Sequence, residues 1–285
     1  MKKSYDLVLA QLISNDSIQS SQLVERINCF VTSPIVNACL IQQSSEEVVH
    51  SDSYSVMAED ICQDTDRIYS MWKYDEELAI KNKAVADMYQ MLYNSDDPTE
   101  EDLLLAFVAN NCLENIVFLG GFAFFFSIED ILPSTSEMIS EIAKDEILSH
   151  VPLFANIFRT AIAESFNGVV PETVVTKAHA MITMISEAEK RWTNYVANGT
   201  ILGFSDRTIK VFIEYQANEV CKNMGIPPVY EDHSNEDNPL LKLVKDHVKG
   251  GEVATKTLFF EGNVADYSKA AVKMDLDLGD LNLDD

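Results

Sequence analysis

The sequence predicts an all-α protein, a bundle of long helices followed by a flexible acidic C-terminal tail. Only 10 Gly and 8 Pro occur in 285 residues, which is little turn chemistry for a protein built of strands. Apolar residues recur at helical spacing over most of the chain. The last residues alternate acids with Leu and carry no such pattern. We therefore expect a helical domain over residues 1–250 and a tail over residues 251–285.

Composition and charge exclude several classes of protein. The net charge of −25 has the wrong sign for binding a nucleic-acid backbone or an anionic membrane surface, so neither is an expected partner. Five cysteines without a CxxC pair argue against a zinc knuckle or a disulfide framework and favour a reducing compartment. No signal peptide is evident. We expect a cytoplasmic protein, in the host cytoplasm if the chain is viral.

The first two helices are expected over residues 4–30 and 35–62. In the first, Leu and Ile recur at helical spacing around one acid in the middle of the helix, Asp16. Pro34 suits the start of the second helix, because a proline in the first turn sacrifices no helical hydrogen bond. Spacings of three and four put a carboxylate, an imidazole and a phenol on one face of this second helix: Glu47, His50 and Tyr54.

A shorter helix is expected near residues 75–93, and the most apolar helix of the chain follows it. Pro98 and its acidic neighbours mark the start, since acids are stabilised by the positive end of the helix dipole. The helix extends to about Ile128 and should be buried on all sides, while its most apolar part is too short to cross a bilayer. Glu114 lies inside it, and a buried Glu must be paired, protonated or bound to a metal.

The next helix begins at Pro133 and carries two residues that could bind a metal, Glu146 and His150, four positions apart. The later elements are expected as helices over residues 133–166, 171–197 and 205–224, and as an irregular segment over residues 227–238.

Long buried helices that each turn a carboxylate or a His inward are typical of a ferritin-like di-metal carboxylate bundle. In that pattern two helices each supply one acid, and two others each supply a Glu followed by a His. Such ligands suit two iron ions, with a dimanganese or a mixed manganese–iron pair as alternatives. Each signal alone is weak, but the chain offers a full set of candidates: Asp16, Glu47, His50, Glu114, Glu146 and His150.

At these residues the sequence resembles the small (β) subunit of class I ribonucleotide reductase, over most of the chain. Asp16-Ser17-Ile18-Gln19 is similar to the family's first-ligand motif. Glu47-x-x-His50-Ser-x-Ser-Tyr54 is similar to its motif of two ligands and a radical tyrosine. Three further stretches resemble the third ligand motif, the fourth ligand motif and the start of the tail: Leu113 to Phe122, Ile142 to Glu146, and Phe259 to Tyr267.

The resemblance implies a mechanism and a set of partners. The metal centre would oxidise Tyr54 to a stable radical, which would pass to the large subunit for the reduction of ribonucleotides to deoxyribonucleotides. Tyr267 would relay the radical between the subunits, and the leucines at the end of the tail would dock in a groove of the large subunit. A homodimer is also implied. Three apolar side chains would shield the radical: Phe118, Phe122 and Ile142.

The chain departs from the family pattern at the last ligand. The family has a His three residues after the fourth Glu, where this chain has Ser149, and His150 follows one position later. Spacings of three and four both keep side chains on one face of a helix, and a one-residue bulge would also bring His150 round. We expect His150 to be the ligand, with a solvent molecule or a substitute ligand as the alternative.

A second departure concerns the N-terminus. Family members carry a Trp that conducts electrons near the cluster and pairs with the Asp before the fourth Glu, which is Asp145 here. Only 15 residues precede Asp16, and neither Trp72 nor Trp192 matches the position of that Trp. The resemblance therefore leaves the usual electron route in doubt.

Two other functions remain open on the sequence alone. One is another ferritin-like di-metal oxidase, against which Tyr54 and the tail with Tyr267 argue, since a self-contained oxidase needs neither. The other is a non-catalytic acidic helical interaction protein, which would leave the buried Glu114 unexplained. The leading hypothesis is the radical-generating small subunit of a ribonucleoside-diphosphate reductase.

Overall fold

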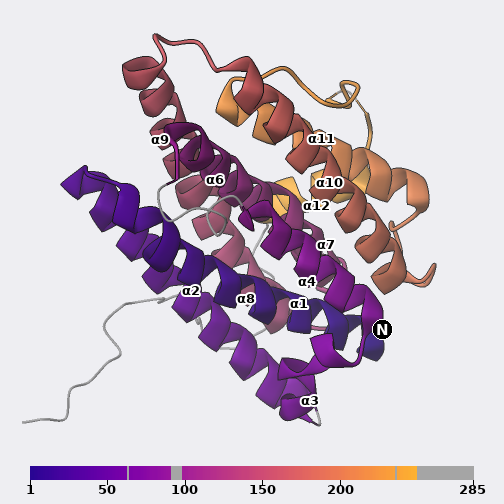
Figure 1. Cartoon of the computed structure of the whole chain (residues 1–285). Helices are drawn as coiled ribbons and strands as arrows, with labels where there is room; N and C mark the ends of the chain where they lie inside the picture. The colour runs from indigo at the N-terminus through magenta and orange to yellow at the C-terminus, as the bar shows by residue number, and fades with distance from the viewer. Residues whose placement is uncertain (63, 91–97, 235, 249–285) are drawn as a thin grey trace, which may run out of the picture. The chain divides into compact units, whose positions relative to one another are not determined.

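The computed structural model of the chain describes residues 1–62, 64–90, 98–234 and 236–248 (Figure 1). Every regular element in these ranges is helical, which confirms the prediction of an all-α fold. The expected tail over residues 251–285 lies outside the described residues.

The first two helices, α1 (Lys2–Ser21) and α2 (Pro34–Ile61), pack against each other. A π-helical segment, η1 (Gln22–Ile27), and a 3-10 turn, η2 (Asn28–Phe30), extend α1 to the end of its predicted range. Pro34 stands in the first turn of α2 as predicted, and the side chain of Ser33 accepts a hydrogen bond from the backbone N–H of Val36.

The remaining helices follow the predicted order, and two short ones, α3 and α12, were not predicted. In α12, Leu240, Val244 and Val248 recur at helical spacing and are buried, so the signal was present in the sequence. The elements are α3 (Thr65–Tyr69), η3 (Met71–Lys73), α4 (Glu76–Met88), α6 (Glu100–Cys112), η4 (Leu113–Phe118), α7 (Leu119–Phe126), α8 (Pro133–Asp145), η5 (Glu146–His150), α9 (Val151–Ser165), α10 (Glu172–Ala197), α11 (Asp206–Met224) and α12 (Pro239–Val248).

The central element is the continuous helix formed by α6, η4 and α7. It begins with a capping box, in which Thr99 and Asp102 each accept a hydrogen bond from the backbone N–H of the other. By length and composition this helix, Glu100–Phe126, could cross a membrane, but 94% of its most apolar window is buried inside the bundle. The prediction of a helix buried on all sides is therefore confirmed.

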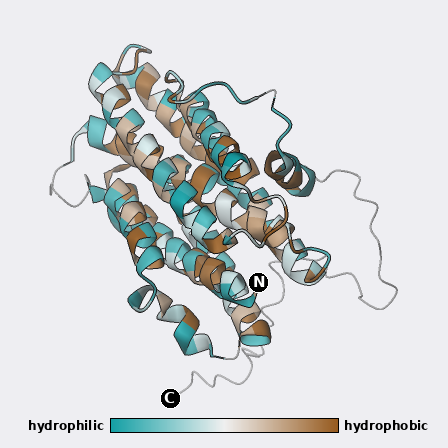
Figure 2. Ribbon diagram, turned by 90° about the vertical axis from the view of Figure 1, so that its right-hand side faces the viewer, coloured by the Kyte–Doolittle hydropathy of each residue, from teal (hydrophilic) through white to brown (hydrophobic). Residues whose placement is uncertain are grey.

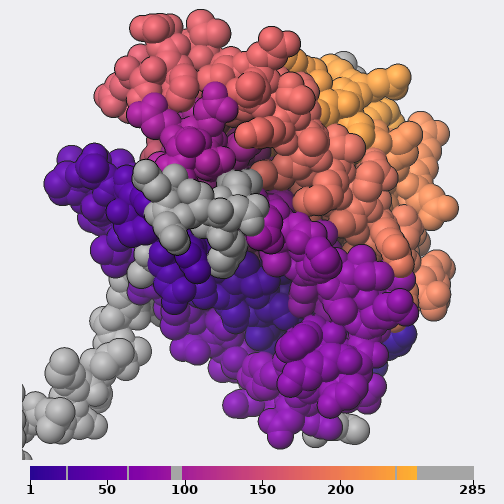
Figure 3. Space-filling view, in the orientation of Figure 1, coloured from indigo at the N-terminus to yellow at the C-terminus, as the bar shows by residue number. Residues whose placement is uncertain are grey.

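Six helices pack on this core helix among the described residues: α1, α8, α9, α10, α11 and α12. Figure 2 shows hydrophobic residues gathered along the inner faces of the ribbons and hydrophilic residues along the outer ones. In Figure 3 the N-terminal helices, indigo to purple, form one side of the described chain, and α11, in orange, lies on the opposite side.

A buried ion pair joins α4 to α10. Lys81 donates to Glu189, and both side chains are at most 1% exposed. The hydroxyl of Thr193 donates to the other carboxylate oxygen of Glu189, at 3.0 Å. Gly120 of α7 lies against this carboxylate so closely that a Cβ atom there would overlap it. The core helix can approach α10 here only because residue 120 is a glycine.

Breaking this pair should strongly destabilise the bundle. We expect Lys81→Met to lower the free energy of unfolding by about 3–5 kcal/mol, because it leaves the Glu189 carboxylate buried without its counter-charge. The double variant Lys81→Met, Glu189→Gln should recover much of that loss, as judged by urea denaturation. Lys83→Met is the matched control, because Lys83 lies on the same helix with a 73% exposed side chain and should contribute at most about 1 kcal/mol. Equal losses for Lys81→Met and Lys83→Met would contradict the assignment.

An ionic cluster holds the irregular segment before α12 onto α11. His233 lies between two carboxylates, with Nε2 at 2.8 Å from Glu214 and Nδ1 at 2.7 Å from Glu236. Burial lowers the pKa of His233, but its hydrogen bonds to Glu214 and Glu236 outweigh burial and raise the pKa above its usual value. Lys190 also reaches Glu214, at 2.8 Å, and Arg207 approaches Glu236 at 3.7 Å.

The stability contributed by His233 should depend on pH. Because the pKa is higher in the folded chain, the contribution is fully present below the unfolded pKa of about 6.5 and is lost as the pH rises through the raised value. We expect the difference in free energy of unfolding between the wild type and His233→Gln to be largest near pH 6 and to shrink toward pH 9. A difference that is constant over this range would contradict the prediction.

Candidate metal centre

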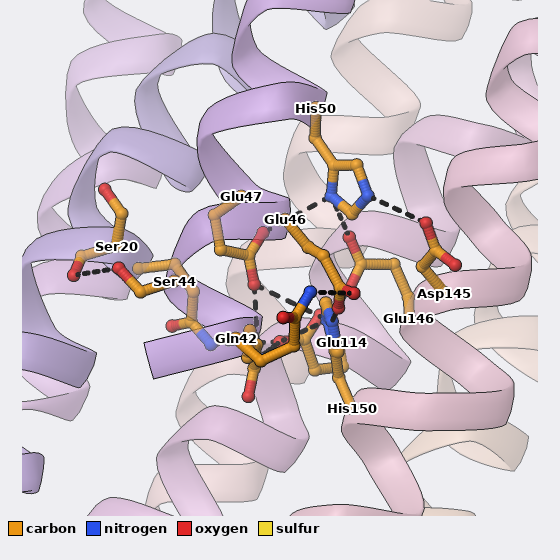
Figure 4. A network of polar contacts seen from close by, with 12 residues as sticks. Ser20, Gln42, Ser44, Glu46, Glu47, His50, Glu114, Asp145, Glu146 and His150 are labelled. Atoms are coloured by element: carbon orange, nitrogen blue, oxygen red, sulfur yellow. Dashed lines mark hydrogen bonds and ion pairs between the residues drawn. The ribbon is translucent and has the colours of Figure 1, made fainter. Parts of the chain in front are cut away.

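The structure brings together all six residues predicted to bind metal. Each is at most 1% exposed. Figure 4 shows the side chains of five of them converging between helices. They come from four separate segments: Asp16 from α1, Glu47 and His50 from α2, Glu114 from η4, and Glu146 and His150 from η5.

Two of these segments are π-helical turns within longer helices. Glu114 lies in Leu113–Phe118, and both Glu146 and His150 lie in Glu146–His150. A π turn holds more residues than an α turn, so a side chain four positions after Glu146 returns to the same face. The structure therefore places His150 inside the cluster, while Ser149 is exposed.

Two carboxylates lie between the two imidazoles. Glu47 approaches Nδ1 of His50 with one oxygen and Nδ1 of His150 with the other, at 3.5 Å each. Glu146 does the same, at 3.1 Å from His50 and 2.6 Å from His150. The ring centroids of the two imidazoles are 6.1 Å apart. Each of these two carboxylates would therefore be able to contact an ion held by either imidazole.

The potential ligand atoms form two overlapping groups. Atoms of Glu47, Glu114, Glu146 and His150 lie within 4.8 Å of one another, and so do atoms of Asp16, Glu47 and His50. Glu47 belongs to both groups. Two metal ions that share Glu47 therefore fit this geometry.

Several buried atoms of the cluster have no hydrogen-bond partner among the described residues. A buried oxygen or nitrogen without a partner costs about 1–3 kcal/mol, and more where it is charged, so these atoms need a ligand. Carboxylate oxygens and imidazole nitrogens are ligands for iron and manganese. The atoms are both carboxylate oxygens of Asp16 and Oε2 of Glu114. Nδ1 of His50, Oε1 of Glu146 and Oε2 of Glu47 also form no hydrogen bond, although the imidazole nitrogen lies 3.1 Å and 3.5 Å from these two oxygens.

Burial and mutual repulsion shape the electrostatics of these carboxyl groups. Burial raises the pKa of Asp16 well above its usual value, and the nearby Glu47 raises it further. Burial also raises the pKa of Glu114 well above normal, together with Glu146 and Glu47. Cations in the site would relieve this repulsion.

The same acids also raise the pKa values of the two imidazoles, against the effect of burial. Burial lowers the pKa of His150, but Glu146, Glu46 and Glu47 together outweigh burial and raise that pKa to about 10. His50 behaves likewise, and its pKa is well above the usual value. Burial raises the pKa of Glu146, but His150 and His50 bring it below normal. Metal ions would therefore compete with protons on the imidazoles.

Two glutamines donate hydrogen bonds to acids of the cluster, and a tyrosine donates to one of the glutamines; no sequence motif indicated these roles. The amide of Gln43 donates to Glu114 at 3.0 Å and to Glu47 at 3.1 Å, while Gln19 donates to Glu114 at 2.9 Å. The hydroxyl of Tyr89 donates to Gln19 at 2.8 Å. Each glutamine stands three or four residues from a predicted ligand in its own helix, and this spacing could have revealed it.

Asp145 lies on the outer side of His50. Its Oδ2 is 3.3 Å from Nε2 of His50, and its side chain is 37% exposed. Neither tryptophan pairs with it in the described structure. Trp192 is buried and donates to Gln11, and Trp72 is 48% exposed.

Tyr54 is fully buried, and its hydroxyl has no hydrogen-bond partner among the described residues. Burial raises the pKa of Tyr54 well above its usual value, and the acids of the cluster, Asp16 first among them, add to this shift. The residues expected to shield it are buried too, with Phe118 and Phe122 stacked at 6.0 Å between ring centroids. The second predicted tyrosine, Tyr267, lies outside the described residues.

Comparison with known proteins gives consistent matches. Residues 1–239 match the family model described as ribonucleotide reductase, small chain. The β subunit of ribonucleoside-diphosphate reductase from Treponema pallidum is 33% identical over 278 residues, covering 96% of this chain and 77% of the relative. The corresponding subunit from Halalkalibacterium halodurans is 27% identical, covering 95% of this chain and 76% of the relative.

Solved structures show the same fold. The ribonucleotide reductase R2 subunit from Clostridium botulinum matches with a TM-score of 0.78 and 28% identity, over 87% of this chain and 77% of that one. The dimanganese(II) NrdF from Streptococcus sanguinis matches with a TM-score of 0.71 over 87% of this chain and 83% of that one. Because the sequence identity to this Streptococcus sanguinis protein is only 21%, the match shows a shared fold alone.

Proposed function

Because this chain belongs to the family of ribonucleotide reductase small chains, we propose that Tyr54 is the residue that stores its radical. The chain is the radical-generating small subunit of a ribonucleoside-diphosphate reductase, and its cofactor is a dinuclear iron or manganese centre. One observation carries the assignment to Tyr54. A fully buried phenol lies among acids whose buried oxygens lack partners in the described structure.

We assign the metal ligands from the overlapping groups of atoms. Asp16 and His50 would hold one ion, and Glu114 and His150 the other, with Glu47 and Glu146 reaching both. When bound, the metal pair supplies the oxidising power that removes an electron from Tyr54.

The protein controls the proton and the surroundings of Tyr54. A neutral phenol that loses an electron also loses its proton, and Asp16 is the acid that most affects the pKa of Tyr54. We assign the uptake of this proton to the acids of the cluster, among which Asp16 has the largest effect on Tyr54. Full burial keeps water and reductants away from the phenol, so a radical there would persist.

The partner is the large subunit of the reductase, as in the family. We propose that residues 251–285 dock to it and that Tyr267 relays the radical between the subunits. The support is the sequence of the tail, in which leucines alternate with acids after Tyr267. This segment lies outside the described residues.

The family is typically dimeric, and the exposed side of α2 is the face that we propose for a second copy. Five of its residues are exposed large apolar side chains: Ile35, Ile41, Val48, Val49 and Val56. On a chain with a net charge of −25, two copies repel each other, so an apolar face is the most favourable contact.

A charge on this face should weaken self-association. Val48 is 53% exposed, so Val48→Asp adds a charge without disturbing the core. We expect it to raise the dissociation constant of the dimer at least about tenfold, as measured by light scattering across a concentration series. The reason is that two paired copies would bury two like-charged carboxylates, one from each copy. Leu202→Asp on the loop before α11 is the control, since Leu202 is 96% exposed and lies on another element. Equal weakening by both changes would contradict the assignment of α2.

The cytoplasm is the compartment that we propose. All five cysteines are free thiols in the structure, as a reducing environment would keep them.

The function is tested by reconstitution of the full chain with iron or manganese. We expect about two ions per chain, a tyrosyl radical signal in electron paramagnetic resonance, and ribonucleotide reduction when the matching large subunit is added. Tyr267→Phe should keep the radical signal and lose turnover, whereas loss of the signal would contradict a relay role. A metal-loaded wild type that never shows a tyrosyl radical would contradict the assignment of Tyr54.

A further inference from the structure

Glu46 immediately precedes the proposed ligand Glu47, and no sequence motif indicated a role for it. One of its oxygens lies 2.9 Å from Nε2 of His150, across 104 positions in the sequence. Its other oxygen accepts a hydrogen bond from the amide of Gln42, one helical turn earlier, at 2.8 Å. The side chain is 22% exposed, so it lies at the edge of the buried cluster (Figure 4).

The two ring nitrogens of His150 face different surroundings. Nδ1 points to the centre of the cluster, 2.6 Å from Glu146 and 3.5 Å from Glu47. Nε2 points outward to Glu46. A neutral imidazole carries one N–H, and the nitrogen without it is the one that can bind a metal. A carboxylate that accepts the Nε2 proton therefore leaves the lone pair of Nδ1 directed at the metal site.

The same arrangement occurs at the other imidazole. Nδ1 of His50 faces Glu146 and Glu47, and its Nε2 faces Asp145 at 3.3 Å. Asp145 immediately precedes Glu146, as Glu46 immediately precedes Glu47. Each outer acid thus precedes a Glu that faces both imidazoles, and it contacts the imidazole of the other segment: Glu46 of α2 contacts His150 of η5, and Asp145 at the end of α8 contacts His50 of α2.

We propose that Glu46 is the positioning residue that selects the Nε2–H form of His150 and so makes this displaced His a metal ligand. His150 stands four positions after Glu146, at the end of a π turn, where its orientation depends on contacts outside its own helix. Glu46 provides such a contact, and Gln42 fixes the carboxylate in turn. This inference rests on the proposed dinuclear centre.

The test compares Mn²⁺ binding to the full-length wild type, Glu46→Leu and Glu46→Gln, with free Mn²⁺ followed by its electron paramagnetic resonance signal. We expect Glu46→Leu to weaken the binding of one of two ions by about 10- to 100-fold. Glu46→Gln should lose less, because its amide oxygen still accepts the Nε2 proton. Glu59→Leu is the matched control, an exposed Glu on the same helix, and should bind like the wild type.

A second readout separates positioning from general stability. In protein loaded with Zn²⁺, which is diamagnetic, the ¹⁵N shifts of His150 report which nitrogen carries the proton. In the wild type and in Glu46→Gln we expect a single form of His150, with the proton on Nε2. In Glu46→Leu we expect that His150 no longer adopts this single form.

The outcomes distinguish this inference from the proposed function. Unchanged binding of two ions and an unchanged His150 form in Glu46→Leu would overturn the role of Glu46 and leave the metal centre intact. If Glu46→Leu does not fold, wild-type ¹⁵N shifts that place the proton on Nδ1 overturn the role equally. A wild type that takes up no metal overturns both proposals.

Discussion

Tyr54→Phe is expected to abolish the radical signal and to reduce reductase activity to background, a loss on the order of a thousandfold or more, equivalent to about 4 kcal/mol. Phenylalanine has no ionisable hydroxyl and is much harder to oxidise. The change should leave the fold intact, since the Tyr54 hydroxyl has no hydrogen-bond partner in the described structure that would be lost. Electron paramagnetic resonance of the reconstituted variant, with its metal content measured in parallel, checks the prediction.

Tyr5→Phe is the matched control for this experiment. Tyr5 is also a buried tyrosine, 2% exposed, but its hydroxyl lies 3.4 Å from the backbone carbonyl of Met57 rather than among the metal ligands. We expect this variant to keep both the radical signal and the activity. A radical signal that survives Tyr54→Phe and disappears in Tyr5→Phe would move the radical to Tyr5.

His150→Ala should weaken the binding of one metal ion by more than about 100-fold, beyond the range typical of residues that only support a ligand. The imidazole supplies Nδ1 at 2.6 Å from Glu146 and is 1% exposed, so water could replace it only by filling a buried cavity. Metal content after gel filtration, and Mn²⁺ titration of the metal-free protein, measure the effect.

Ser149→Ala is the control at the position where the family carries its His. Ser149 is exposed, so its hydroxyl does not point into the cluster, and we expect unchanged metal binding. The reverse pattern, with binding lost in Ser149→Ala and kept in His150→Ala, would show that the serine or a water bound to it is the ligand. Both variants should fold, which circular dichroism of the metal-free proteins can establish.

The helical framework could be predicted because it depends mostly on local properties. The acidic, capped start at Thr99 and the uninterrupted apolar run after it are readable from a few neighbouring residues, and the core helix follows from them. α12 was missed although its apolar spacing was present, because a ten-residue segment becomes a stable helix only when its apolar face is buried. That burial depends on distant helices.

The candidate site, too, could be predicted only in part from the sequence. The residue types and their spacing predicted the six ligand candidates, and the structure brings all six together. A bulge was considered only near His150, as one alternative, and the π turn at Glu114 was not predicted. An α turn and a π turn differ by a small change in backbone hydrogen bonding, which packing decides.

By itself, the sequence determined which long helices form, which of them carry an acid or an imidazole, and that Tyr54 shares a face with Glu47 and His50. Only the tertiary structure decided which atoms meet. Glu46 reaches His150, and Gln19 reaches Glu114, across about a hundred positions in the chain. Contacts of this kind depend on how whole helices pack, and packing is set by the summed burial of many side chains rather than by any local pattern.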